Sequence, residues 1–428
     1  DSGRFLPQKK MTVDDALKAA MRFYRSFEAP PEMVPYSQIV GYDRSIITDE
    51  LLGKQSSLPE ASCQQLPSQW HGVLMFDMGR VTMQSLDVHT DKVICEGDID
   101  LLQQAGFNFV GLGFDFSLFQ GPNPSEGMIN EARLKVLDQV IAWCMERNIH
   151  VDLRCLGVGG CTIKTDFGEW MNRNHDIPNS TDEKDVTEFA ELWAVLARRY
   201  QDIPNRYISF NLMVEPEISA EKQYAAFFAP VVEAIRKVTP DRCIIADIHS
   251  SGLTGVSMAK LGVALSYHLY EPRMFCALND LPEDHINDEA YLHSITWPYH
   301  GDNGKVYDAK KAMDMKIDHS ISANGLLQTA NQYKVGFMIG EFGIFGEHPG
   351  QISRYRYNDE TFHGFLNDMT STFAEKGIAW CYGVCQGNTG LVADYPAVET
   401  EEYQKADGTT VYIGTKVMDW FQKINGVQ

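Results

Sequence analysis

The stretch "RYISFNLMVEPE" (Arg206–Glu217) decides the fold. It is a nearly unbroken apolar run that stops at Glu215 and Pro216. A strand with one face in water alternates apolar and polar residues, whereas a strand of a parallel sheet covered on both faces is apolar throughout. We therefore predict a buried parallel strand whose carboxyl end carries an acidic side chain.

The sequence on both sides of this run repeats one arrangement. Amphipathic helical stretches flank it at 185–202 and 226–239, and strand–helix–strand connections impose parallel pairing. Eight apolar runs alternate with helical stretches from Trp70 onward: 72–78, 107–114, 149–156, 206–214, 242–248, 263–270, 335–342 and 378–385. This pattern predicts a (β/α)8 TIM barrel. A doubly wound open sheet is the alternative, which is disfavoured because no glycine-rich phosphate loop follows an early strand.

The first 69 residues differ from the rest of the chain. Helical spacing at 12–27 is followed by a segment with several prolines and serines and few strand signals. We predict an N-terminal extension, residues 1–69, packed on a barrel domain, residues 70–428. A separate binding domain is the alternative, but so short a segment has little core of its own.

Charge and composition limit the classes of molecule that the protein is expected to bind. The chain has 428 residues, 22% of them charged and 44% hydrophobic, which is ordinary for a globular protein. A formal net charge of −21 disfavours nucleic acid and anionic membrane surfaces. The apolar runs are too short to span a bilayer. We expect a neutral partner, an oligosaccharide or polysaccharide, and a monomeric protein.

The cysteines indicate neither a disulfide framework nor a metal site. There are nine, an odd number, and many lie inside apolar runs, as Cys144, Cys243 and Cys381 do. Buried free thiols are the expected state. The pairs in "CLGVGGC" and "CYGVC" lack the partner spacing of a zinc site. We expect no metal and no cofactor.

Two glutamates stand at strand ends. Glu215 ends the fourth apolar run, and Glu341 ends the seventh in "FMIGEFG". A buried unpaired charge costs several kcal/mol, so a carboxylate after an apolar run is tolerated best where it opens into a polar cleft. Strands four and seven of an eight-stranded ring face each other across its mouth, and a pair of facing carboxylates is what a retaining glycosidase requires. The alternative for each is a helix cap or an arginine partner.

At these motifs the chain resembles glycoside hydrolase family 5, the cellulase-like retaining barrels, over residues 70–421. "DLLQQAGFNFVGL" resembles the family's second-strand entry, "YISFNLMVEPE" its acid/base strand, "SYHLYEP" its sixth strand and "YKVGFMIGEFG" its nucleophile strand. The resemblance implies that Glu215 is the acid/base and Glu341 the nucleophile. It also implies that His268 and Tyr270 flank them, with Tyr270 donating a hydrogen bond to Glu341.

The chain departs from the family pattern beside the acid/base. Val214 stands where family members usually carry an asparagine that holds the sugar 2-hydroxyl, a contact that strengthens in the transition state. Asn211 lies on the same strand, one layer deeper, and is a candidate for partial replacement.

Two further departures concern positive charge. Gly111 replaces the family's second-strand arginine, and Arg154 occupies its third-strand histidine position. We hypothesise that Arg154 takes over the missing charge and lowers the pKa of Glu341. The alternative is that Arg154 neutralises Glu215 or an acidic loop residue.

The sequence offers several candidates for the aromatic residues that would stack on sugar rings. Gly383 stands where family members often present an eighth-strand tryptophan, and Trp380 near the start of that strand is either a platform or a core residue. Trp297, in a long interruption at 269–310, and Trp170, after the third strand, are further substrate-binding candidates because aromatic rings suit the apolar faces of sugars.

These features together predict a retaining β-glycoside hydrolase acting on a neutral β-glycan. The alternative is a catalytically impaired, glycosidase-like carbohydrate-binding protein, motivated by the departures at positions 111, 154, 214 and 383. A third possibility is an unusual substrate that lacks a free 2-hydroxyl. Because polymeric glycans lie outside cells, we expect an extracellular or cell-surface location, although no signal peptide is visible; the free thiols favour the cytoplasmic alternative.

Overall fold

The structure is a computed structural model. It describes residues 32–75, 94, 96–116, 119, 127–158, 161–162, 183–216, 218–249, 252–277, 285, 288–301, 303–314, 325–344, 358–384, 392–393, 400–404 and 410–427. The helix expected at 12–27 and the candidate Trp170 lie outside these residues.

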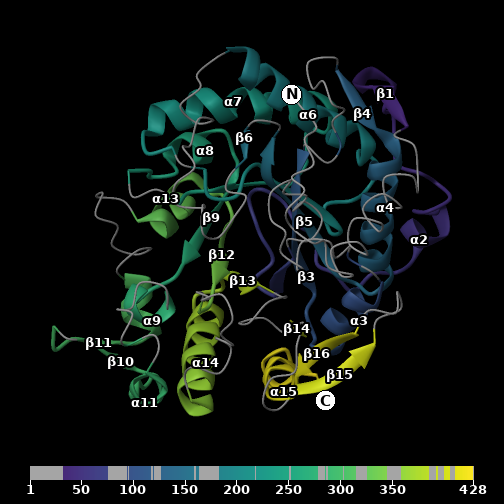
Figure 1. The fold of residues 1–428 in the computed structure, drawn as a ribbon. Coiled ribbons are helices and arrows are strands. Elements are labelled where there is room, and N and C mark those ends of the chain that lie inside the picture. Colours follow the sequence, from purple (N-terminus) through teal and green to yellow (C-terminus); the bar gives the residue numbers. More distant parts are fainter. Residues whose placement is uncertain are drawn as a thin grey trace, which may run out of the picture.

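The predicted barrel is confirmed (Figure 1). Its strands are β2 (His71–Met75), β3 (Phe109–Asp115), β5 (His150–Val158), β7 (Ile208–Asn211), β8 (Ile244–Asp247), β9 (Ala264–Leu269), β12 (Phe337–Phe342) and β13 (Ala379–Val384). Each pairs in parallel with the next, and β13 pairs with β2, so the ring closes. All eight coincide with the apolar runs of the sequence.

Helices surround the ring. They are α3 (Glu96–Gln104), α4 (Glu131–Glu146), α6 (Glu183–Arg199), α7 (Glu221–Val238), α8 (Val256–Lys260), α13 (Leu326–Tyr333), α14 (Asp359–Glu375) and α15 (Thr415–Ile424). In α7, Phe227, Val231 and Ile235 recur at i, i+4 and are buried against the barrel, as an amphipathic helix requires. Among the described residues, no helix combines the length and apolar character needed to cross a membrane.

The described part of the predicted extension lies against the barrel. Strand β1 (Met33–Pro35) pairs with β4 (Met128–Asn130), and the 3-10 helix η1 (Tyr36–Gln38) and helix α2 (Asp49–Gly53) follow. Arg198 of α6 donates to the Tyr36 carbonyl at 3.0 Å, and the amide of Gly336 donates to the Cys63 carbonyl at 2.8 Å. These contacts tie residues 36–63 to the barrel wall, while a domain boundary at residue 69 stays a prediction.

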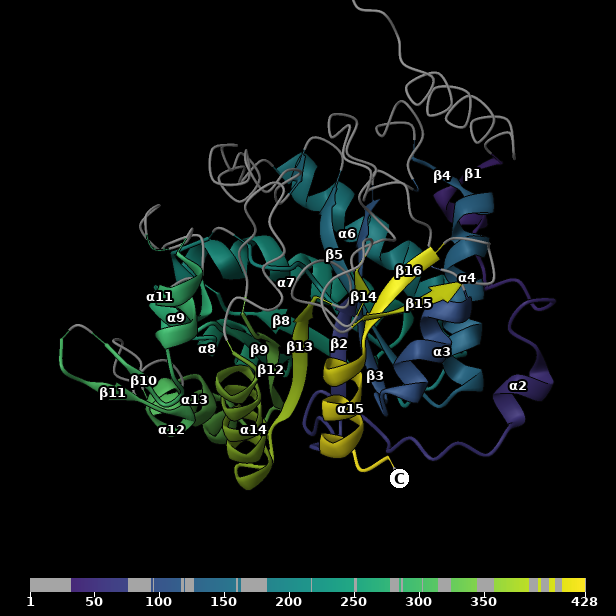
Figure 2. The same cartoon turned by 60° about the horizontal axis from the view of Figure 1, so that its bottom comes forward.

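The long interruption after β9 packs beside α14 where it is described (Figures 1 and 2). It contains α9 (Arg273–Cys276), α11 (Glu289–Ser294), the hairpin β10 (Tyr299–His300) and β11 (Val306–Tyr307), and α12 (Ala309–Met313). Thr361 of α14 donates to the Ile295 carbonyl at 2.9 Å. The remaining strands are β6 (Cys161–Thr162), which pairs with β5, and the sheet of β14 (Val392–Ala393), β16 (Thr410–Gly414) and β15 (Thr400–Gln404).

The prediction of buried free thiols is confirmed for part of the cysteines. Six are free and buried: Cys63, Cys144, Cys155, Cys243, Cys276 and Cys381.

Candidate active site

Four neighbouring strands bring ionisable side chains together at one end of the barrel. Glu215 follows β7, Asp247 is the last residue of β8, His268 lies in β9 with Tyr270 just beyond it, and Glu341 lies in β12. The carboxyl ends of parallel barrel strands meet at one face, which is where active sites of such barrels form.

One imidazole nitrogen lies close to both of the predicted catalytic glutamates. His268 Nδ1 lies 2.8 Å from Glu215 Oε1 and 3.3 Å from Glu341 Oε2. The two oxygens therefore lie no farther apart than the sum of these distances, about 6 Å, which fits the roughly 5–5.5 Å of retaining glycosidases better than the 6.5–9.5 Å of inverting ones. The Tyr270 hydroxyl donates to Glu341 Oε2 at 2.9 Å, so the hydrogen bond predicted from the sequence is confirmed.

Burial sets the protonation of Glu341 and Tyr270. Burial raises the pKa of Glu341 to about 7; the positive charges of His268 and Arg154 oppose this rise, and the negative charge of Glu215 adds to it. Burial and the same Glu341 carboxylate raise the pKa of Tyr270 well above its usual value. The phenol therefore stays a donor, aimed at an oxygen that must carry negative charge to act as a nucleophile.

His268 is held as a cation by carboxylates. Burial alone lowers its pKa, but Glu341 and Asp247 outweigh burial and raise the pKa well above the ordinary value for histidine. Its Nε2 lies 2.9 Å from Asp247 Oδ2, on the side of the ring away from Glu215. The ring is fully buried, so a charge there depends on these partners.

Glu215 occupies a strained backbone conformation. Its φ is +44°, in the left-handed region that side chains other than glycine rarely adopt. Such a conformation costs about 1–3 kcal/mol and is concentrated at active sites, where the surrounding structure holds it. Here the amide of the preceding residue, Val214, donates to the Cys155 carbonyl at 2.8 Å.

Arg154 fills the space that Gly111 leaves. Its side chain is fully buried; Nε donates to Asp152 Oδ2 and Nη1 to the Gly340 carbonyl, both at 2.8 Å. A Cβ at position 111 would lie 2.8 Å from Arg154 Nε, so only glycine admits the guanidinium here. The ion pair with Asp152 replaces the alternative pairing with Glu215. The charge of Arg154 still acts on Glu341, because it opposes the rise in the pKa of Glu341 that burial causes. Its role as the replacement charge stays a prediction.

The fit around Gly111 predicts a stability effect. Gly111→Ala is expected to lower the free energy of unfolding by about 1–3 kcal/mol, because the methyl group overpacks Leu74 and Arg154. Gly383→Ala is the matched control: its nearest neighbours would be the Phe342 carbonyl at 3.4 Å and the Tyr270 hydroxyl at 3.5 Å, ordinary contacts. Denaturant unfolding measures both, and equal stability of the two variants would contradict this packing.

Val214 and Asn211, at the predicted sugar contact, are both buried. Val214 is buried, with 6% of its surface exposed. Asn211 is fully buried, and its amide donates to Asp247 Oδ1 at 2.9 Å. The side-chain amide of Asn211 therefore has a protein partner, and the role of Asn211 as a substitute sugar ligand stays a prediction.

The two aromatic candidates that the structure describes, Trp380 and Trp297, have different outcomes. Trp380 as a sugar platform is wrong: only 1% of its surface is exposed, and its ring stacks on His71 and packs edge-on against Phe107 and Phe342. Trp380 lies near the start of β13, where the side chains between the barrel strands and the surrounding helices form the hydrophobic core. Trp297 packs on Phe365, and its indole nitrogen donates to Asp368 of α14 at 3.0 Å, so its role with a sugar stays a prediction.

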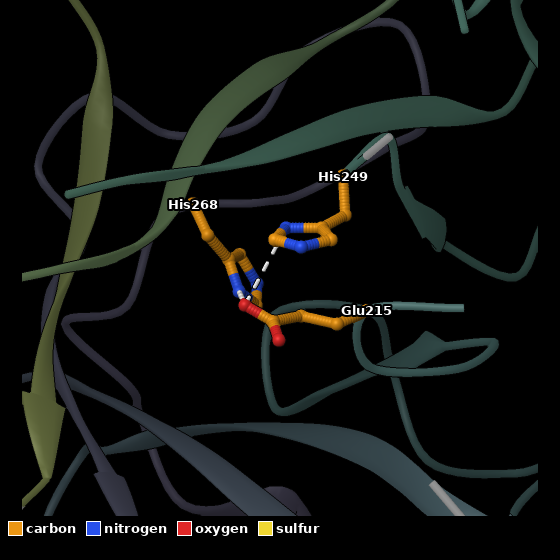
Figure 3. Close-up of side chains that lie close together, drawn as sticks. All are labelled: Glu215, His249 and His268. Atoms are coloured by element: carbon orange, nitrogen blue, oxygen red, sulfur yellow. Dashed lines mark hydrogen bonds and ion pairs between the residues drawn. The ribbon is translucent and has the colours of Figure 1, made fainter. Parts of the chain in front are cut away.

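Among the described residues, one group has the geometry of possible metal ligands. Glu215, His249 and His268 each offer an atom within 4.8 Å of the other two, and Figure 3 shows both imidazoles next to the Glu215 carboxylate. Tetrahedral zinc, with ligands at about 2.0–2.1 Å, holds neighbouring ligand atoms about 3.3 Å apart. His268 Nδ1 and Glu215 Oε1 lie at 2.8 Å, a hydrogen-bond distance, and we interpret the group as a hydrogen-bonded cluster.

Sequence reasoning missed Asp247 and Asp152. Both are fully buried, one beside His268 and the other beside Arg154. The signal for Asp247 was present, because it ends the apolar run "CIIAD" as the two glutamates end theirs. His249, two residues later, lies 3.5 Å from Glu215 Oε1, and 41% of its side chain is exposed.

Known proteins share this architecture. A crystal structure titled as that of a glycoside hydrolase superposes with a TM-score of 0.60 at 20% identity, covering 83% of this chain and 98% of that one. Endoglucanase Cel5A from Thermotoga maritima superposes with a TM-score of 0.56 at 16% identity, covering 83% of this chain and 97% of that one. At these identities the likeness shows the fold.

Sequence comparison supplies the family. Endoglucanase C of Acetivibrio thermocellus is 22% identical over 277 residues, covering 60% of this chain and 76% of its own length. Endoglucanase 3 of Fibrobacter succinogenes is 22% identical over 338 residues, covering 71% of this chain and 48% of its own length. The family model for cellulases matches residues 69–386, which contain both glutamates and all eight strands of the barrel. The chain belongs to glycosyl hydrolase family 5 and is a glycoside hydrolase.

Proposed function

We propose that this protein is a retaining β-glycoside hydrolase that cleaves a neutral β-glycan by double displacement. The observation that carries the proposal is the pair of carboxylate oxygens next to one nitrogen of His268, which lie at most about 6 Å apart and therefore closer than the 6.5–9.5 Å of inverting enzymes. The endoglucanase names of the relatives support a β-glucan as the first substrate to try.

The geometry suggests a role for each glutamate. Glu341 attacks the anomeric carbon, and the hydrogen bond that its Oε2 accepts from the Tyr270 hydroxyl orients the carboxylate. Glu215 protonates the leaving oxygen. Once the glycosyl–enzyme bond has neutralised Glu341, Glu215 acts as a base toward water.

The net charge of −21 suits an uncharged polymer better than an acidic one. A substrate of this kind lies outside cells, so an extracellular or cell-surface location goes with the proposal, as does action by a monomer.

The test is sugar release from a panel of β-glucans, mannans, xylans and aryl β-glycosides, with the anomeric configuration of the first-formed product followed by proton NMR. Release of a product with the β configuration supports the proposal. A product with inverted configuration would contradict it.

A catalytically impaired carbohydrate-binding protein is the second candidate. It is favoured by the buried Val214 beside Glu215 and by Gly383, which presents no side chain next to Tyr270. Binding to a member of the same panel without sugar release, under conditions where a related endoglucanase is active, would establish this candidate instead.

The charge of Arg154 predicts a pH effect. In Arg154→Gln the buried positive charge is lost, so the ionised form of Glu341 is destabilised and its pKa rises from about 7. The acidic limb of kcat/KM, which reports ionisation of the nucleophile, should move to higher pH by about 1 unit. Arg242→Gln is the control, because Arg242 is equally buried but donates to the carbonyls of Tyr200 and Ile203. An unmoved acidic limb in a folded Arg154→Gln protein would disprove the charge replacement.

A further inference from the structure

Asp247 connects three parts of the catalytic cluster. Its Oδ2 lies 2.9 Å from His268 Nε2 and accepts a long hydrogen bond, 3.4 Å, from the amide of Glu215. Its Oδ1 accepts from the Asn211 amide at 2.9 Å, and its backbone carbonyl accepts from the Tyr224 hydroxyl at 2.7 Å. A fully buried carboxylate with this set of donors is held in one orientation.

The charge of this carboxylate is also fixed. Burial alone raises the pKa of Asp247, but His268, Arg154 and the Asn211 hydrogen bond outweigh it and hold the pKa below its usual range. Asp247 is therefore an anion that is not consumed by any step of the proposed reaction. It lies on the far side of the His268 ring from the two glutamates.

We propose that Asp247 is a positioning residue that keeps His268 charged and aimed at Glu215, so that His268 Nδ1 stores the proton that the acid/base delivers. This inference rests on the proposed function, since it assigns Glu215 as the acid. A catalytic histidine whose second nitrogen faces a buried carboxylate has a fixed ring orientation and a stabilised cationic form.

The proton transfer balances. The Nδ1–H bond of His268 breaks and an O–H bond forms on Glu215 Oε1, 2.8 Å away. The imidazolium and the carboxylate become a neutral imidazole and a neutral carboxylic acid, and Nε2–H still faces anionic Asp247. Glu215 then gives the same proton to the glycosidic oxygen. The two forms contain equal numbers of protons, so the acid stays available whichever of the two side chains holds the proton.

Other charges facing His268 act on the same equilibrium. They come from each neighbouring element: Glu215 after β7, His249 after β8, Tyr270 just beyond β9, Glu341 on β12 and, beyond Asp247, Arg154 on β5. Gly340 lies against the ring: a Cβ there would clash with Ser266 Oγ and lie 3.2 Å from Cδ2 and Nε2 of His268. Among these charged groups of the described chain, only Asp247 contacts His268 Nε2. Removing the charge of Asp247 therefore tests the Nε2 side of the ring separately from the Nδ1 side.

The test is Asp247→Asn, which keeps the shape and removes the charge. Histidine side-chain NMR, with the His268 signal assigned by its loss in His268→Gln, should show His268 protonated well above its ordinary range in the wild type. In Asp247→Asn its titration should move to lower pH by about 1–3 units, the effect of losing an adjacent opposite charge. The alkaline limb of kcat/KM should move in the same direction.

The dependence of kcat/KM on the leaving group distinguishes a loss of proton supply from a general loss of active-site structure. For a substrate with a poor leaving group, which needs the acid, kcat/KM should fall by about 10²-fold in Asp247→Asn, within the range that general acid catalysis contributes. A dinitrophenyl glycoside, which leaves without a proton, should lose much less. A purely structural role lowers both equally. Asp138→Asn is the matched control, a fully buried carboxylate bound by Arg199 and Tyr200 between α4 and α6, and should leave the His268 titration in place.

Two results overturn the inference: a wild-type His268 that titrates at or below its ordinary value, or a folded Asp247→Asn protein with unchanged His268 titration and equal losses on both substrates. The first needs no variant, so the inference stays testable if Asp247→Asn does not fold. Failure of the proposed function looks different: no protein hydrolyses the panel, while the His268 titration still responds to Asp247→Asn.

Discussion

Replacing Glu341 by glutamine is expected to lower kcat by at least about 10³-fold, equivalent to about 4 kcal/mol of transition-state stabilisation. Glutamine has the same shape and still accepts the hydrogen bond from Tyr270, but its amide oxygen does not form a stable bond to the anomeric carbon. Because Glu341 is 7% exposed in a preformed cluster, the substitution should leave the fold intact. Reducing-sugar release from the preferred glycan measures the loss.

The control for this variant is Glu221→Gln. Glu221 is a half-buried carboxylate of α7 that accepts hydrogen bonds from the amides of Thr254 and Ser257, away from the two catalytic glutamates. Its replacement should lower stability and leave kcat within about twofold, the behaviour of a structural site. Activity of Glu341→Gln equal to that of this control would contradict the assignment of the nucleophile.

Replacing Glu215 by glutamine is expected to reduce hydrolysis of glycans by about 10²–10⁴-fold, the usual contribution of a general acid. The loss should depend on the leaving group. A dinitrophenyl β-glycoside should still form the glycosyl–enzyme, because its phenolate leaves without a proton, and the intermediate should then accumulate. The burst of phenolate in the first turnover measures this step.

Added azide provides the second arm of the Glu215 experiment. A small anion needs no general base, so it should release the accumulated intermediate and yield a glycosyl azide of β configuration. Glu341→Gln should give neither the burst nor the β azide. A Glu215→Gln protein with equal losses for all leaving groups would show that Glu215 is not the acid/base.

The barrel follows from local patterns in the sequence. Buried parallel strands require unbroken apolar runs and the covering helices require amphipathic spacing, and both are visible at 206–214 and 226–239. The two glutamates were found for a related reason, since each breaks an apolar run at a strand end. Asp247 carries the same signal at the end of "CIIAD", yet a single acidic residue there predicts no particular partner.

The ion pairs and packing contacts among the site residues could not be predicted from the sequence. The sequence offered Glu341, Glu215 or an acidic loop residue as the anion near Arg154, but the guanidinium pairs with Asp152, two residues away on its own strand, and Gly111 leaves the space that it fills. Trp380 and Gly383 differ by three positions on one strand, and which of them faces the cleft depends on the strand's register and tilt in the closed ring. Such choices depend on packing between elements distant in sequence.

The most direct test of the central claim is to locate the covalent intermediate. An activated 2-deoxy-2-fluoro glycoside of the sugar that the panel identifies should inactivate the enzyme slowly and add one glycosyl mass, because fluorine slows release of the glycosyl–enzyme. Peptide mapping by mass spectrometry is predicted to place the adduct on Glu341. Continued turnover without an adduct, or an adduct on another residue, would contradict the proposal that Glu341 is the nucleophile of a double displacement.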